Sequence, residues 1–308
     1  MIGIRPSISR PVANGEERKR IDELEERLER HVIVLSREIG ERNLLRPDNL
    51  KNAADYVREF WQGIGYDVTA QRYTVGGFEC ENLSAEVPGA EREEEIVIVG
   101  AHYDSVQGSP GANDNASAIA SLLEISRLFN REPRKRTIRF VAFTNEEAPY
   151  FQTEWRGSRI YARMCVEKKE RIVSMIALET MGFYSDQPGS QTYPLPLSLF
   201  YPDTGNFAAV VGNVRSRALV KAFTKYFMEG VDFPVECIAA FSSIPGISWS
   251  DHSSFWEENI PAIMVTDTAF YRYPFYHTHL DTPDRIRYPC LARVTYGCFQ
   301  ALITLTEK

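Results

Sequence analysis

Apolar residues along the chain fall into short continuous runs that alternate with one-sided patterns. The run 96–99 is apolar throughout, which is typical of a strand buried on both faces of a sheet. Residues 47–64 instead repeat their apolar positions every three or four residues, as on the buried face of an amphipathic helix. Similar patterns predict strands at 66–73, 78–87, 137–143, 172–178, 234–240 and 262–265, and helices at 16–30, 115–129, 157–166, 215–228, 255–259 and 290–306.

This alternation of strands and helices predicts an α/β fold with a mixed, mostly parallel central sheet and helices on both faces. The first two strands form a hairpin that turns at Gly76 and Gly77. Segment 185–213 is rich in Pro, Gly and Tyr, so we expect surface loops there rather than an independent lid or dimerisation domain. We therefore expect a single domain over residues 16–308, preceded by an N-terminal extension, 1–15.

Charge and composition exclude several classes of protein. The 35 basic and 42 acidic residues give a net charge of −7, whereas nucleic-acid-binding proteins normally carry a basic excess. No apolar run reaches about 18 residues, so no membrane-spanning helix is expected. The five cysteines are scattered and form no CxxC pair, which argues against a disulfide scaffold and against a thiolate zinc site.

Residues 1–15 lack the apolar core of a signal peptide. The simplest expectation is a cytoplasmic protein, although a leader preceding this sequence would leave the same pattern. The oligomeric state stays open.

Polar side chains follow the ends of the predicted strands. In open α/β sheets, ligands bind outside the carboxyl ends of the strands, so these side chains are expected at one rim. Four strand ends contribute, together with the start of helix 115–129. The residues are His102, Asp114, Glu146, Glu147, Glu179 and His277.

Each of these residues alone has an ordinary structural explanation. Asp114 could cap a helix, His102 could be a buried structural histidine, and a pair of glutamates is usually solvated. Their joint position on one rim favours a metal site, since imidazole and carboxylate without thiolate suit a catalytic zinc ion. There are more candidate ligands than one catalytic zinc needs. They suit two metals about 3.5–4 Å apart that share a carboxylate and a water, with one carboxylate left as general base.

Six strings in a fixed order carry a resemblance to a known family: GAHYDS, GANDNASAIA, NEEAPYF, LETMG, SDHSSF and YHTHLDTPD. They resemble the co-catalytic zinc aminopeptidases of peptidase family M28, over about residues 97–284. Relatives of that family include bacterial leucyl aminopeptidases, glutamate carboxypeptidase and animal glutaminyl cyclases. The resemblance implies the zinc-exopeptidase fold and two zinc ions per chain.

The resemblance also implies a role for each matching residue. His102 and Glu179 would bind one zinc, Glu147 and His277 the other, and Asp114 both; Glu146 would be the general base, and Asp104 would orient His102. Many members have Asp where this chain has Glu179. The peptide bond between Asp114 and Asn115 is expected to be cis. His279 falls at a variable position and is not expected to bind metal, whereas His252 is a candidate substrate contact.

The activity implied by the resemblance is hydrolysis of N-terminal residues from peptides or small aminoacyl compounds. A glutaminyl cyclase, which uses one zinc, is the first alternative. A carboxypeptidase is the second, and it would need an arginine cluster for the substrate carboxylate; Arg156, Arg159 and Arg272 are the candidates. A non-enzymatic relative would be expected to lose ligands or the base. The link between Glu147 and Gly157 is longer than in well-studied aminopeptidases, so we expect a loop near the metal rim.

Overall fold

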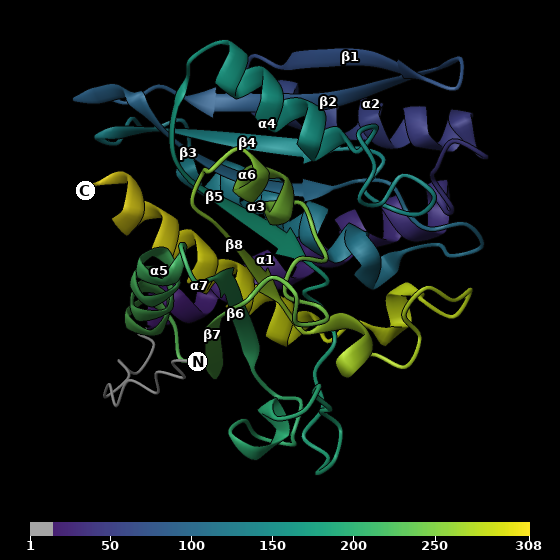
Figure 1. The fold of residues 1–308 in the computed structure, drawn as a ribbon, viewed down its shortest axis with the longest axis vertical. Coiled ribbons are helices and arrows are strands. Elements are labelled where there is room, and N and C mark those ends of the chain that lie inside the picture. Colours follow the sequence, from purple (N-terminus) through teal and green to yellow (C-terminus); the bar gives the residue numbers. More distant parts are fainter. Residues whose placement is uncertain (1–14) are drawn as a thin grey trace.

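One twisted sheet organises the structure, a computed structural model that describes residues 15–308 (Figure 1). The predicted extension 1–15 lies outside the described residues except for Gly15, which begins the first helix. The strand order is β1-β2-β4-β3-β5-β8-β6-β7. The strands are β1 Thr69–Val75, β2 Phe78–Val87, β3 Arg92–His102, β4 Arg136–Phe143, β5 Arg171–Glu179, β6 Ala208–Asn213, β7 Val235–Ala240 and β8 Ala262–Thr266.

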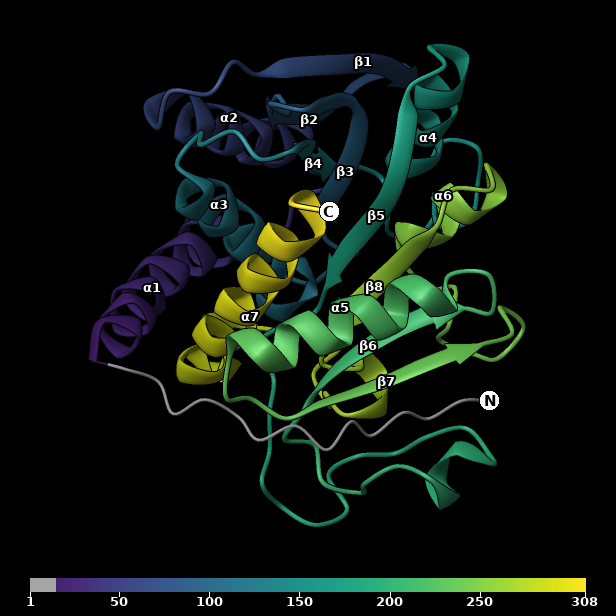
Figure 2. The ribbon, with the colours of Figure 1, turned by 90° about the vertical axis from the view of Figure 1, so that its left-hand side faces the viewer.

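The helices fall close to the segments predicted from apolar spacing. They are α1 Gly15–Ile33, α2 Pro47–Gly63, α3 Ala118–Phe129, α4 Gly157–Glu167, α5 Arg217–Gly230, α6 His252–Glu257 and α7 Tyr288–Thr306. Figure 2 shows α1, α3 and α7 on one side of the sheet and α4 and α6 on the other. The sheet is therefore covered on both faces, as predicted, and none of the helices described is long and apolar enough to cross a membrane.

Parallel pairing at the centre of the sheet brings several strand ends to one edge. Strand β3 pairs in parallel with both β4 and β5, and β5 pairs in parallel with β8. His102 lies level with Phe143, and Glu179 lies level with Thr266. The carboxyl ends of β4, β3, β5 and β8 consequently meet at one rim, which is where the sequence predicts the chemistry.

The prediction for segment 185–213 was wrong in one respect, because it contains strand β6. This strand pairs in parallel with β7 and antiparallel with β8, and so joins the edge strand β7 to the rest of the sheet. Its sequence, AAVVGN, is short and follows a stretch rich in turn residues, so it lacks a clear strand signal. Leu197 and Phe207 of the preceding loop are buried against this end of the sheet, so the loop is partly a wall rather than a free surface. Within the described residues the loop contains a single turn of 3-10 helix and no domain of its own.

Candidate active site

The predicted residues gather at the rim formed by the parallel strands. His102 is the last residue of β3, and Glu179 is the last residue of β5. Glu146 and Glu147 follow β4, and His277 lies in the loop after β8. His277 has a φ of 58°, in the left-handed region that is uncommon for residues with a Cβ and that recurs at functional sites.

Asp114 reaches the rim from the helical turn Ala112–Ser117, which precedes α3. The backbone leaves helical geometry at Asp114 and Asn115, and the peptide bond between them is cis, as expected. The side chain of Asn115 accepts a hydrogen bond from the Thr180 N–H and donates one to the Leu178 carbonyl. Asn115 thereby fixes the chain on both sides of Glu179.

The donor atoms divide into two groups around Asp114. On one side, Nε2 of His102 lies 3.5 Å from Asp114 Oδ1 and 3.3 Å from Glu179 Oε2. On the other side, Nε2 of His277 lies 3.0 Å from Asp114 Oδ2 and 3.3 Å from Glu147 Oε2. The two oxygens of one carboxylate thus face two different pairs of side chains, which is the division that the resemblance implies.

Burial and like charge make this cluster electrostatically costly on its own. Burial, reinforced by the charge of Asp114, raises the pKa of Glu147 to about 7, and burial also raises the pKa of Glu179. Burial disfavours the charged form of His102 as well, but the Glu179, Asp104 and Asp114 carboxylates outweigh it and raise the His102 pKa well above its usual value. Additional positive charge beside these buried carboxylates would favour their ionised forms.

The residues present fit divalent metal ions. Donor atoms of His102, Asp114 and Glu147 all lie within 4.8 Å of one another. Glu147 Oε1 is buried and accepts no hydrogen bond from the residues that the structure describes. Imidazole and carboxylate donors are those that zinc prefers in catalytic sites. The residues that would hold metal here are His102, Asp114, Glu147, Glu179 and His277.

Asp104 supports both sides of this cluster. Its Oδ1 lies 3.5 Å from Nδ1 of His102 and accepts the backbone N–H of Glu146 at 3.2 Å. Its Oδ2 accepts the backbone N–H of Glu147 at 3.1 Å. One buried carboxylate therefore lies beside His102 and fixes the two consecutive glutamates, while the Asp104 backbone carbonyl lies 3.3 Å from Nδ1 of His102.

Sequence reasoning missed Asp281, which supports the backbone at Asp114. Its carboxylate accepts the N–H groups of Asn113 at 2.7 Å and Asp114 at 3.1 Å, and it also accepts the hydroxyl of Tyr273. Asp281 stands in the string YHTHLDTPD, four residues after His277. That position near a candidate ligand was the only available signal.

The SDHSSF string contributes differently from the prediction. The Ser250 hydroxyl donates to Glu179 Oε2 at 2.7 Å, and no side-chain hydrogen bond caps the start of α6. His252 is fully buried, with Nε2 at 2.8 Å from the Ile247 carbonyl and its ring against Trp256. Burial lowers the pKa of His252 to about 3. The prediction that His252 contacts substrate is therefore wrong, because its side chain is buried away from the surface. His279 is exposed and takes no part in the ion pairs of the cluster, which His277 makes.

The three arginines considered for a substrate carboxylate all have partners. Arg156 contacts Glu146, and Arg159 donates to Glu257. Arg272 donates to the side chain of Gln191 and to the Phe207 carbonyl. Arg156 and Arg159 line one cavity, but Arg272 is not among the residues that line it. The expected loop near the rim is present as a series of turns over 148–155, and Arg156 follows it.

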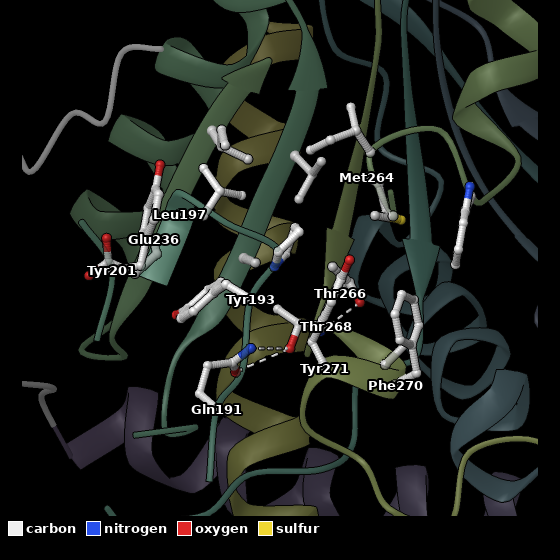
Figure 3. Close-up of a pocket in the computed structure, with 18 of the residues that line it drawn as sticks. Gln191, Tyr193, Leu197, Tyr201, Glu236, Met264, Thr266, Thr268, Phe270 and Tyr271 are labelled. Atoms are coloured by element: carbon white, nitrogen blue, oxygen red, sulfur yellow. Dashed lines mark hydrogen bonds between the residues drawn. The ribbon is translucent and has the colours of Figure 1, made fainter. Parts of the chain in front are cut away.

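An apolar cavity of about 100 Å³ adjoins the donor cluster. Figure 3 shows side chains that line it. Glu179 lines it on the side of the cluster, as does Tyr276, whose ring stacks on His277. Gln191 and Thr268 also line it and hydrogen-bond to each other. Its apolar walls come from the loop before β6, from the sheet and from the loops around α6 and after β8. They include Tyr193, Leu197, Phe207, Ile247, Met264 and Phe270.

The fold and the donor cluster together define the class: an α/β protein with a candidate metal site at the carboxyl ends of parallel strands. The model of peptidase family M28 matches residues 82–302, which is more than half of the chain. The chain therefore belongs to peptidase family M28. It is similar to the uncharacterized protein YfbL of Escherichia coli (strain K12), with 38% identity over 286 residues, 90% of this chain and 87% of that protein.

Solved structures share the fold at low sequence identity. BSAP, a zinc aminopeptidase from Bacillus subtilis, matches with a TM-score of 0.70 and 16% identity, covering 92% of this chain and 95% of that one. Fimbriiglobus ruber glutaminyl cyclase matches with a TM-score of 0.67 and 19% identity, covering 91% and 94%. These likenesses show the fold alone, and that fold carries two different activities.

Proposed function

We propose that this chain is a two-zinc aminopeptidase that removes N-terminal residues from peptides. The observation that carries the proposal is the division of donors around Asp114, whose two oxygens face His102 and His277 separately. Glu146 lies beside this arrangement, with Oε2 at 3.9 Å from His102 Nε2. A buried carboxylate next to a two-metal site, but outside both ligand groups, suits a general base.

The residues of the chain divide the work of hydrolysis between them. Two zinc ions held there would polarise the scissile carbonyl and lower the pKa of the attacking water. Glu146 takes the proton of that water at Oε2 and later delivers it to the leaving amine. Asp104 and Ser250 keep Glu146, Glu147 and Glu179 in place through the hydrogen bonds described above.

The cavity supports a substrate with a large apolar side chain at its N-terminus. A side chain that fills the cavity brings the α-amino group of the same residue close to the Glu179 carboxylate, which lines the wall. Gln191 and Thr268 satisfy each other by hydrogen bonds, so an apolar side chain next to them breaks no polar contact. Burial of such a side chain is favourable by about 1.5–3 kcal/mol.

A glutaminyl cyclase is the second candidate, because a solved cyclase shares the fold over nearly its whole length. A carboxypeptidase has less support, since Arg156, Arg159 and Arg272 already have partners. The test is an assay of the zinc-loaded protein with leucine p-nitroanilide, its N-acetyl derivative and a peptide with N-terminal glutamine. We expect hydrolysis of leucine p-nitroanilide and none of its N-acetyl derivative, which lacks the free amine. Formation of pyroglutamate without hydrolysis would identify a cyclase instead.

A further inference from the structure

A buried arginine contacts the residue proposed as general base. Arg156 is 2% exposed, and its Nη2 donates a hydrogen bond to Oε1 of Glu146, which is 6% exposed. Arg156 stands at the end of the loop between Glu147 and α4, ten residues after Glu146. The loop therefore returns to the rim and places a positive charge against the side chain on which the proposed mechanism depends.

The guanidinium group of Arg156 is itself held on several sides. Nη1 donates to the Ser253 hydroxyl at 3.1 Å. Nε has no hydrogen-bond partner among the described residues and lies 3.7 Å from Oδ1 of fully buried Asp251, as an ion pair. The guanidinium carbon lies 5.3 Å from the centre of the Phe151 ring. Because a guanidinium is planar and presents its N–H groups in a rigid fork, these contacts fix the direction of the N–H group that reaches Glu146.

The two oxygens of Glu146 have different surroundings. Oε1 accepts the hydrogen bond from Arg156, whereas Oε2 lies toward the donor cluster, 3.9 Å from Nε2 of His102. With one oxygen anchored, the carboxylate cannot turn freely about its last bond, and the other oxygen stays directed at the cluster. A general base must lie within hydrogen-bond reach of the proton it removes, and a misplacement of about 1 Å can cost about 100-fold in rate.

We propose that Arg156 is a positioning residue for catalysis, which anchors Oε1 of Glu146 so that Oε2 faces the attacking water. The assignment rests on the aminopeptidase function proposed above. Asp251 and Ser253, from the start of α6, hold the arginine from the opposite side and belong to the same support.

Two other roles for Arg156 lead to different kinetics. A purely structural ion pair would compensate the buried charge of Glu146 and affect stability rather than the chemical step. A substrate contact would be the second such role, because Arg156 also borders a cavity together with Arg159 and Ser253. Loss of a substrate contact would raise KM, whereas loss of a positioning residue lowers kcat.

The test measures kcat and KM for leucine p-nitroanilide in the zinc-loaded full chain. Arg156→Met is expected to lower kcat about 10- to 100-fold with KM within about threefold, and Arg156→Lys to recover part of kcat. In a Glu146→Gln background, Arg156→Met is expected to change kcat by less than about twofold, because no base remains to be positioned. Arg139→Met is the matched control, since Arg139 pairs with Glu86 and Glu170 and does not line the cavity that Arg156 borders.

An equal fall of kcat in both backgrounds would overturn the proposal, and so would a rise in KM with kcat unchanged. Arg156→Met leaves Glu146 and Asp251 buried without their cation, so it is also made together with Asp251→Asn. This second variant lowers the buried charge and keeps the comparison available if the single variant does not fold.

Crystal structures of the zinc-loaded wild type and of Arg156→Met give a readout that needs no activity. The proposal expects the Glu146 carboxylate to lose its single orientation in the variant, and an unchanged carboxylate would overturn it. A wild-type protein that hydrolyses no aminoacyl substrate would refute the proposed function, while the crystal comparison would still decide the role of Arg156.

Discussion

Replacement of Asp104 by asparagine tests the support of the candidate metal site without touching a ligand. The Asp104 carboxylate accepts the N–H groups of Glu146 at 3.2 Å and Glu147 at 3.1 Å, and it faces Nδ1 of His102 at 3.5 Å. An asparagine side chain has one acceptor oxygen and one NH₂ group. At least one of the two N–H groups therefore loses its acceptor and meets a donor instead.

The expected magnitude follows from these contacts. A hydrogen bond to a charged group contributes about 1.5–3 kcal/mol, and one such bond is lost at a site that is 2% exposed. Loss of a residue that orients metal ligands typically lowers metal affinity about 10- to 100-fold. We expect Asp104→Asn to weaken zinc binding by that factor and to lower kcat, because Glu146 and Glu147 are both less well fixed.

The assay is competition for zinc with a chromophoric chelator, combined with thermal unfolding in the presence and absence of zinc. Asp67→Asn serves as the matched control, since Asp67 is exposed and lies away from the rim. The stabilisation by zinc should shrink in Asp104→Asn and stay unchanged in the control. Zinc affinity of Asp104→Asn within about twofold of the wild type would refute the supporting role of this carboxylate.

Three further predictions concern the base, the core and the pH dependence of stability. Glu146→Gln should retain zinc and lower kcat about 10²- to 10⁴-fold, whereas a near-normal kcat in the zinc-loaded variant would mean that another residue is the base. Fully buried Arg42 donates hydrogen bonds to the backbone carbonyls of Tyr103, Pro110 and Gly111, which would lose these donors in Arg42→Met. We expect this substitution to lower the free energy of unfolding in denaturant by about 3–5 kcal/mol, and a loss below about 1 kcal/mol would contradict this. Burial alone would raise the pKa of Glu124, but hydrogen bonds from His31 and Arg127 outweigh it and hold the pKa below its ordinary value of 4.5. The ionised Glu124 therefore stabilises the fold above that pH and loses its effect in acid, so the unfolding free energies of wild type and Glu124→Gln should converge as the pH falls below 4.5.

Local patterns were sufficient to predict most of the fold. The run 96–99 and its counterparts are apolar because central parallel strands are buried on both faces, and the structure confirms them as β3, β4, β5 and β8. Strand β6 was not predicted, because it has only six residues and follows a stretch of turn residues. Its pairing with β7 and β8 is what makes this segment a strand. Pairing of this kind is a tertiary effect that a local pattern does not contain.

The candidate site was predictable to the extent that it lies at strand ends. The strand-end rule brings His102, Glu147, Glu179 and His277 together without any knowledge of side-chain contacts. Arg156 could not be assigned in this way, because its contact with Glu146 depends on the path of the loop between them. For His252 the sequence motif led to a wrong prediction, because the motif lies beside the site but the side chain of His252 is buried against the Ile247 carbonyl.

The most direct test of the two-zinc site is an anomalous-scattering map, recorded at the zinc absorption edge from crystals of the zinc-loaded protein. We predict two peaks about 3.5–4 Å apart, bridged by Asp114, with His102 and Glu179 on one and Glu147 and His277 on the other. A single peak at full zinc loading, or a peak bound by His279 in place of His277, would contradict it.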